Sequence, residues 1–302
     1  MADRNALTSR QIPFMTLSDG SDSSLTAPPP PLPHYLTPDG RAVARFAVEG
    51  NVVVTGGAGT LGLSTARALL EHGASGVALW DLPETLQSSN PAIDELQKAS
   101  QDSQVLAIPV DVTRQASIEI GLRTTLAELG SVDHLFCFAG IVGCVPALTM
   151  TADQFRKTLD VNTTGSFLTA QAIAQHMASN PAPNRSITLT ASISAHRVNY
   201  PQPQAAYNVS KAAVVALKSS LAAEWAHAGI RVNSISPGYM DTILNAGEGS
   251  IEKMRKVWAS RNPMGRMGAV GELDGVCVLL ASRAGTYING ADFVIDGGAT
   301  LC

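Results

Sequence analysis

Residues 52–62 read VVVTGGAGTLG and join a β-branched run, a glycine-rich break and the start of a helical pattern. The valine run suits a strand buried on both faces of a parallel sheet, and the apolar spacing over residues 61–70 suits a helix. A glycine turn between a strand and a helix presents free backbone N–H groups and the helix dipole to an anion. The stretch therefore predicts a dinucleotide-phosphate site, and an ordinary glycine-rich turn is the alternative.

Strand-like and helix-like segments alternate along the rest of the chain, which predicts a parallel sheet with helices on both faces. The expected strands lie at residues 52–54, 76–81, 105–110, 132–138, 186–191, 230–235 and 291–295. The expected helices lie at residues 61–70, 93–100, 118–129, 151–179, 205–228 and 273–281. Because no repeat or linker divides residues 45–302, the sequence predicts a single doubly wound Rossmann-type α/β domain with about seven strands.

The ends of the chain and one internal segment differ in composition from the rest. Residues 1–35 are rich in Ser, Asp and Pro and have too little apolar surface to offset the entropy of ordering, so we expect a flexible tail. Residues 36–302 then form the single catalytic domain. Within it, residues 242–262 combine charge with scattered apolar side chains, as a segment that covers a substrate does.

The composition argues against several classes of partner. The net charge of −4 gives no electrostatic reason to expect nucleic acid or an anionic membrane. No apolar run approaches the roughly 18 residues of a membrane span, and the first residues lack the apolar core of a secretory signal. Cys137, Cys144, Cys277 and Cys302 have no metal-ligand spacing, so we expect reduced thiols, no bound metal and a cytoplasmic protein.

Tyr207 and Lys211 are four residues apart, so both side chains project from one face of a helix. An ammonium about 4 Å from a phenolate gains about 4 kcal/mol at an effective dielectric near 20, which would lower a phenol pKa of about 10 to about 7. Such a tyrosine exchanges protons near neutral pH, as a general acid/base must. Ser192, at the end of an expected strand, is placed to bond the substrate oxygen. On most helices such a pair is a packed tyrosine and a solvated lysine. The pair therefore indicates catalysis only in combination with the surrounding motifs.

The surrounding motifs follow the order of a known family. They are Thr55-Gly56 with Gly62, Asp81, Asp111-Val112, Ala139-Gly140, Asn162, Ser192, Tyr207 with Lys211, and Pro237-Gly238-Tyr239-Met240-Asp241-Thr242. Over about residues 45–300 the chain resembles the short-chain dehydrogenase/reductase family. Residues 263–268 and 296–298 are most similar to fungal polyol dehydrogenases and to sugar or ketone reductases of this family.

The resemblance implies four catalytic residues. Tyr207 would be the general acid/base, and Lys211 would tune it and hold the nicotinamide ribose. Ser192 would orient the substrate. Asn162 would organise a water relay behind Lys211.

The resemblance also implies a nicotinamide cofactor and the residues that bind it. Thr60 and Leu61 are expected beside the diphosphate, and Met240 and Thr242 beside the nicotinamide carboxamide. The full expected set is Gly56, Thr60, Leu61, Asp81, Asp111, Val112, Ala139, Gly140, Tyr207, Lys211, Pro237, Met240 and Thr242. Asp81 ends the second expected strand, where a carboxylate accepts hydrogen bonds from the adenosine ribose. This position predicts NAD as the preferred cofactor, with NADP as the alternative.

Three departures from the family pattern bear on the site. Residues 59–60 read Gly-Thr, which shifts one glycine by a position, so we expect cofactor binding with altered phosphate contacts. Residues 137–138 read Cys-Phe in place of the usual Asn-Asn, which loses an asparagine of the central sheet and puts an aromatic ring beside the cofactor. Ser194 lies 13 residues before Tyr207, the commoner spacing for a catalytic serine, and Ser192 lies 15 before it. We favour Ser192 because it stands at the strand end.

The leading hypothesis is an NAD(P)-dependent oxidoreductase that interconverts a secondary alcohol and a ketone by hydride transfer. The altered Cys-Phe pair motivates an alternative, a non-redox isomerase, dehydratase or cyclase, and a nucleotide-sensing module is a third hypothesis. His196, Asn199 and Gln204 lie in the loop beside the site, where solvated or locally bonded side chains are expected rather than substrate contacts. The alanine-rich helices at 151–179 and 205–228 carry apolar residues on more than one face, which predicts a homo-oligomer, by resemblance a tetramer.

Overall fold

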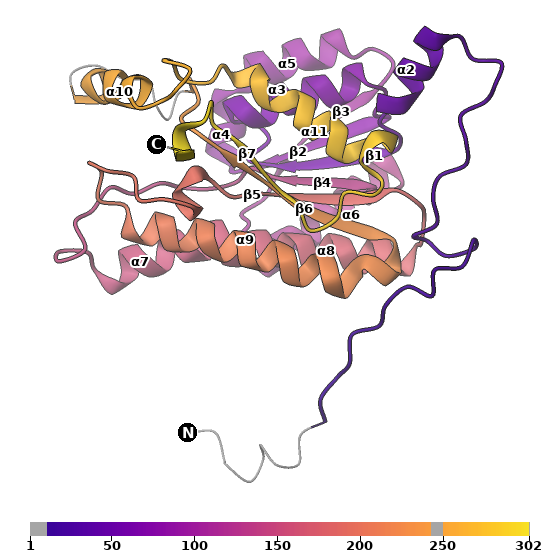
Figure 1. Ribbon diagram of the computed structural model, residues 1–302, viewed down its shortest axis with the longest axis horizontal. Helices are drawn as coiled ribbons and strands as arrows, with labels where there is room; N and C mark the ends of the chain where they lie inside the picture. Colours follow the sequence, from indigo (N-terminus) through magenta and orange to yellow (C-terminus); the bar gives the residue numbers. More distant parts are fainter. Residues whose placement is uncertain (1–10, 243–249, 302) are drawn as a thin grey trace.

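The computed structural model describes residues 11–242 and 250–301 (Figure 1). Within these residues, seven parallel strands form one sheet in the order β3-β2-β1-β4-β5-β6-β7. The strands are β1 (Asn51–Thr55), β2 (Gly76–Asp81), β3 (Gln104–Pro109), β4 (His134–Cys137), β5 (Arg185–Thr190), β6 (Ile230–Pro237) and β7 (Asp292–Ile295). The predicted doubly wound sheet is confirmed. Its strand order reverses between β1 and β4, which is where ligands bind in such folds.

Helices cover both faces of the sheet, because each presents an apolar stripe to it (Figure 1). One face is covered by α3 (Thr60–Glu71), α5 (Asn90–Ala99) and α11 (Asp274–Ala281), the other by α6 (Gln115–Leu129), α8 (Ser166–Ser179) and α9 (Ala205–Trp225). A further helix, α10 (Ser250–Ser260), lies beyond the strand ends at the left of Figure 1. Trp80 of β2 is fully buried and donates its Nε1–H to Thr125 of α6 at 3.0 Å. In the described part of the chain, no helix has the length and apolar character to cross a bilayer.

The structure adds three α-helices where none is predicted and interrupts a predicted one. The added helices are α2 (Pro38–Phe46), α4 (Pro83–Ser88) and α10. The helix predicted over residues 151–179 consists of α7 (Ala152–Leu159), the π-helical turn η1 (Asp160–Gly165) and α8. Short 3₁₀ turns are η2 (Ile193–Ala195), η3 (Ala226–Ala228), η5 (Val270–Leu273), η6 (Arg283–Gly285) and η7 (Ala299–Leu301). The π turn lets Asn162 bond both backbone groups of Ile141, at 2.8 and 2.9 Å. Periodicity misses this turn because helix continues on both sides of it, and such turns often occur at functional sites.

Residues 11–37 contain no helix or strand and run along one side of the domain (Figure 1, indigo). Leu25 packs against Gly229, in the turn between α9 and β6. The backbone oxygen of Pro30 accepts a hydrogen bond from the Arg283 guanidinium. The flexibility of the N-terminal tail stays a prediction, and its first ten residues lie outside the described part of the chain.

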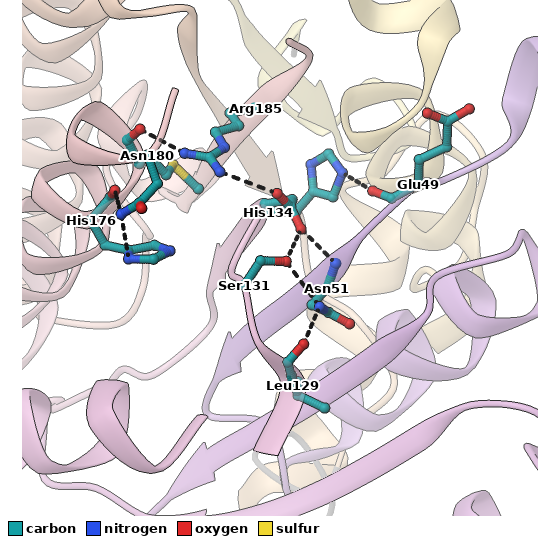
Figure 2. A network of polar contacts seen from close by, with 10 residues as sticks. Glu49, Asn51, Leu129, Ser131, His134, His176, Asn180 and Arg185 are labelled. Carbon is teal, nitrogen blue, oxygen red and sulfur yellow. Dashed lines mark hydrogen bonds and ion pairs between the residues drawn. The ribbon is translucent and has the colours of Figure 1, made fainter. Parts of the chain in front are cut away.

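A buried polar network lies at the amino ends of β1, β4 and β5 (Figure 2). The carboxylate of Asp133 accepts hydrogen bonds from the backbone N–H of Asn51 at 2.9 Å and from the hydroxyl of Ser131 at 2.7 Å. The same carboxylate lies 3.5 Å from the guanidinium of Arg185, the first residue of β5. These contacts join three strands at the edge of the sheet opposite to their carboxyl ends.

His134, the first residue of β4, lies in this network as a neutral imidazole. Its Nε2 is 2.9 Å from the carbonyl oxygen of Glu49, which can only accept, so Nε2 carries the proton and Nδ1 accepts from the hydroxyl of Ser186 at 2.8 Å. Burial, together with the positive charges of Arg231 and Arg185, lowers the pKa of His134 to about 4. The bond to the Glu49 carbonyl and a nearby carboxylate oppose this lowering only in part.

We expect His134 to make the fold sensitive to acid. In the unfolded chain His134 titrates near 6.5, whereas in the folded protein it stays neutral down to about pH 4. Its contribution to stability is therefore complete above about pH 6.5 and is lost as the pH falls towards 4, by up to about 3 kcal/mol. Urea unfolding across this range should show a weaker pH dependence in His134→Gln than in wild type or in His227→Gln, an exposed control. Equal pH dependence in all three proteins would contradict this account.

Candidate active site

The carboxyl ends of β1, β4, β5 and β6 bring the sequence motifs to one edge of the sheet. Gly56 follows β1, Ala139 lies just beyond β4, Ser192 lies just beyond β5, and Pro237 ends β6. Tyr207 comes from the first turn of α9, which packs on β6 and β5. Motifs that are far apart in the sequence therefore surround one region.

The loop after β1 and the start of α3 pack so closely that several positions, Gly56 and Gly62 among them, admit only glycine. Gly56 has a φ of 65°, and a Cβ there would lie 2.6 Å from the backbone nitrogen of Ala139. A Cβ on Gly62 would lie 2.4 Å from the backbone oxygen of Gly56. Thr60, which replaces the family glycine, is the first residue of α3, where the helical backbone accommodates a side chain. No side chain of the described residues caps α3, so its first N–H groups are available to an anion.

Asp81 ends β2 beside this loop, as the sequence predicts. One carboxylate oxygen accepts the backbone N–H of Ala58 at 3.1 Å, and the other accepts that of Leu82 at 2.8 Å. Burial raises the pKa of Asp81, and these two backbone bonds partly offset it. The carboxylate is thus held in a fixed orientation at the end of the strand.

Tyr207, Lys211 and Ser192 lie together. The Ser192 side chain lies close enough to the Tyr207 hydroxyl to lower its pKa. The Nζ of Lys211 lies 5.7 Å from the centroid of the Tyr207 ring and donates to the backbone oxygen of Thr190 at 2.7 Å. The Ser192 hydroxyl donates to that of Ser194 at 3.1 Å, so Ser192 stands between Tyr207 and Ser194. Of the two candidate serines, Ser192 is therefore the one that contacts the tyrosine.

The pKa of Tyr207 differs from the sequence expectation. Burial raises the pKa, the nearby Ser192 hydroxyl lowers it only in part, and the electrostatic effect of Tyr239 raises it further. The expected lowering by Lys211 is wrong for this arrangement, because the ammonium faces the Thr190 carbonyl and is itself buried. Burial lowers the pKa of Lys211 to about 8. The group whose pKa approaches neutrality is thus the amine, not the phenol.

Asn162 is fully buried behind this cluster. Besides its two bonds to Ile141, its Nδ2 donates to the Ser210 hydroxyl at 3.0 Å, and its backbone oxygen accepts the Ser166 hydroxyl at 2.8 Å. A Cβ on Gly140 would lie 3.2 Å from the Asn162 Oδ1 and 3.6 Å from the Lys211 Nζ. Asn162 therefore joins the loop after β4 to α9, and the relay expected of it stays a prediction.

The other predicted cofactor residues lie along the same edge and make contacts within the protein. Asp111 accepts bonds from the backbone N–H and hydroxyl of Thr113 at 2.9 and 2.6 Å. The sulfur of Met240 packs against Gly268, and the N–H of Thr242 donates to the Met240 carbonyl at 2.9 Å. Their contacts with a cofactor stay predictions.

A cavity of about 410 Å³ lies beside the cluster and is lined by residues 197–200, Tyr239, Trp258 and Arg261. The sequence predicts a solvated or locally bonded Asn199, and the structure shows it buried and bonded to the Tyr239 hydroxyl, in the lining of this cavity. Tyr239 and Trp258 were not predicted as substrate contacts, although Tyr239 lies in a quoted motif and Trp258 in the expected substrate-covering segment. Residues 243–249 of that segment lie outside the described part of the chain.

The other two residues of this loop face the protein. The Nε2 of His196 lies 2.9 Å from the Asp292 carboxylate and 3.1 Å from the Ser236 hydroxyl. Gln204 is buried, and its Nε2 donates to the sulfur of Cys144 at 3.2 Å. His196 is also exposed to solvent, whereas Gln204 is enclosed, so both are bonded within the protein and one is solvated, as the sequence predicts.

A nicotinamide dinucleotide fits this arrangement of residues. The glycine cradle at Gly56 and Gly62 and the uncapped start of α3 suit a diphosphate. The Asp81 carboxylate suits ribose hydroxyls, and the absence of a side chain on Gly140 leaves room in front of Lys211.

The comparisons with known proteins agree with this fit. A family model described as enoyl-(acyl carrier protein) reductase matches residues 56–300. A short-chain type dehydrogenase/reductase from Mycobacterium marinum has a TM-score of 0.80 and 38% identity, covering 86% of this chain and 99% of that one. The NADP-dependent mannitol dehydrogenase of Alternaria alternata is 36% identical over 259 residues, 84% of this chain and 93% of the relative. The D-arabinitol 2-dehydrogenase (ribulose-forming) of Candida tropicalis is 38% identical over 269 residues, 85% of this chain and 94% of the relative.

The fold and the site define a dinucleotide-dependent oxidoreductase. The chain belongs to the short-chain dehydrogenase/reductase family, as its motifs indicate, and its similarity to fungal polyol dehydrogenases is confirmed. It interconverts a secondary alcohol and a ketone with NAD(H) or NADP(H). The comparisons give no support to the non-redox alternative.

Proposed function

We propose that the protein oxidises an acyclic polyol to a ketose and catalyses the reverse reduction. The observation that carries this proposal is the Tyr207 hydroxyl with Ser192 beside it, next to a cavity whose lining mixes aromatic rings with amide and guanidinium groups. Such a lining suits a chain of carbon atoms that bears hydroxyl groups. The names of the mannitol and arabinitol dehydrogenases among the relatives support the same substrate class.

In this proposal Tyr207 exchanges the proton of the substrate oxygen, and Ser192 donates a hydrogen bond to that oxygen. The nicotinamide supplies or accepts the hydride when bound. Lys211 holds the nicotinamide ribose, and its bond to the Thr190 carbonyl fixes the ammonium beside the reacting groups. Asn162 fixes the loop after β4 and α9 so that these groups keep their geometry.

The experiment that tests the proposal is a turnover assay with purified protein, following the nicotinamide absorbance. Mannitol, arabinitol and sorbitol should be oxidised, and fructose, ribulose and sorbose reduced, faster than monohydric secondary alcohols or simple ketones. A preference for simple or polycyclic ketones over every ketose would refute the polyol assignment while keeping the reaction class.

We further propose that the enzyme prefers NAD(H) to NADP(H). The support is the fixed carboxylate of Asp81, which would repel a 2′-phosphate on the adenosine ribose. The only basic residue of α3, Arg67, is paired with Glu95 of α5 at 3.0 Å and so is engaged away from Asp81. This preference would distinguish the protein from the relatives named as NADP-dependent.

We also propose a cytoplasmic homotetramer built on α7, α8 and α9. The outward side of α9 is rich in exposed alanine and includes the half-exposed Val209, which suits close packing against a second copy. Light scattering at micromolar concentration should give four times the chain mass. A monomeric mass at that concentration would contradict this proposal.

A further inference from the structure

Two aromatic rings from separate segments form one wall of the cavity. The ring of Tyr239, which follows β6, and that of Trp258, on α10, are stacked with centroids 4.3 Å apart and planes 7° apart. Both residues line the cavity, and Trp258 is 8% exposed. The stack thus packs α10 against the segment that follows β6.

The polar edges of both rings are held by the loop that follows Ser192. The Oε1 of Gln202 accepts the Tyr239 hydroxyl at 2.9 Å and the Trp258 Nε1–H at 2.9 Å. The Tyr239 hydroxyl in turn accepts from the Nδ2 of Asn199 at 3.0 Å. One amide oxygen therefore fixes two rings that belong to different parts of the chain.

This wall stands next to the reacting groups. Tyr239 lies close enough to Tyr207 to affect its titration, and the loop that carries Gln202 begins at Ser192. A displacement of the rings would therefore alter the space beside the substrate oxygen without moving Tyr207, which is fixed on α9.

We propose that Gln202 is a positioning residue for substrate recognition: its Oε1 holds Tyr239 and Trp258 as a two-ring wall against which the carbon chain of the substrate lies. The inference rests on the proposed function for the identity of the substrate, an acyclic polyol or ketose. Its C–H groups pack on the rings, while its hydroxyl groups reach the polar lining supplied by Asn199 and Arg261.

Two substitutions of Gln202 distinguish the effect of its hydrogen-bond acceptor from the effect of its side-chain shape. Gln202→Met has similar length but no acceptor, whereas Gln202→Glu keeps an oxygen that accepts from both rings. We expect Gln202→Met to raise the KM for the best polyol or ketose about tenfold, a change of about 1.4 kcal/mol, with kcat and the KM of the cofactor within about threefold of wild type. Gln202→Glu should restore the KM to within about threefold of wild type.

A spectroscopic measurement reports on the stacking of the two rings without requiring turnover. The stacked Tyr239–Trp258 pair should give a near-ultraviolet circular dichroism signal that Gln202→Met loses and Gln202→Glu keeps. Trp258→Phe should abolish this signal, whereas Trp225→Phe, at the end of α9, should leave it. The same Trp258→Phe variant, which keeps a ring but loses the N–H, should raise the KM as Gln202→Met does.

The outcomes distinguish this inference from the proposed function. If Gln202→Met keeps the circular dichroism signal, or keeps a wild-type KM for a substrate that the wild type turns over, the positioning role is refuted. If the wild type turns over no polyol or ketose but reduces another ketone, the proposed substrate class fails. The circular dichroism comparison and the KM for that ketone then decide the role of Gln202 by themselves.

Discussion

Tyr207→Phe should remove nearly all turnover and leave cofactor affinity within about threefold of wild type. The substitution deletes only the hydroxyl that lies beside Ser192, so the ring still fills its place on α9. General acid/base catalysis contributes about 100-fold to 10,000-fold in rate, so we expect a loss of that size in kcat. Steady-state kinetics and a cofactor titration followed by fluorescence measure the two effects separately.

Two further variants are compared with Tyr207→Phe. Lys211→Ala should damage both turnover and cofactor affinity, because the buried ammonium would hold the ribose and so place the nicotinamide beside Tyr207. Tyr287→Phe removes a hydroxyl from a fully exposed ring and should behave as wild type. A Tyr207→Phe enzyme with more than about a tenth of wild-type activity would rule out Tyr207 as the acid/base, since that loss is less than about 1.4 kcal/mol.

The centre of the sheet was predictable because β1, β2 and β4 are buried on both faces and so read as short apolar runs. The strand at 76–81 agrees residue for residue, and the one at 52–54 is extended by a single residue at each end. Their order follows from alternation with helices and from the reversal that the glycine loop marks. α2 and α4 were not predicted because neither has a buried residue, so their sequences show no apolar stripe.

The candidate site was predictable where the chemistry depends on residue type and position in one element. The contact between Ser192 and Tyr207 follows from a strand end and a helix start that the fold brings together. The raised pKa of Tyr207 was not predictable, because burial and the bond from Lys211 to Thr190 depend on tertiary packing. For the same reason the pairing of Tyr239 with Trp258 has no signal in the spacing of the sequence.

The wild-type enzyme should use NAD(H) with a kcat/KM about 100-fold higher than with NADP(H). A 2′-phosphate at the end of β2 would place two negative charges against the carboxylate of Asp81. One pair of like charges about 4 Å apart costs about 4 kcal/mol at an effective dielectric near 20, and about 2.8 kcal/mol already corresponds to 100-fold. The carboxylate cannot easily turn away, because the backbone N–H groups of Ala58 and Leu82 hold both of its oxygens.

The decisive comparison is between Asp81→Ser/Leu82→Arg and the single variant Asp81→Asn. Asparagine removes the charge but keeps the size of the side chain, so it should bring the two cofactors to within about tenfold of each other. The double variant adds a cation at the strand end and should reverse the preference, because an arginine there accommodates a 2′-phosphate. Residue 82 is half-exposed, so its arginine can reach the ribose without displacing the core. A wild type that works better with NADP(H), like the mannitol dehydrogenases named for it, would overturn the assignment, and so would a double variant whose preference does not move.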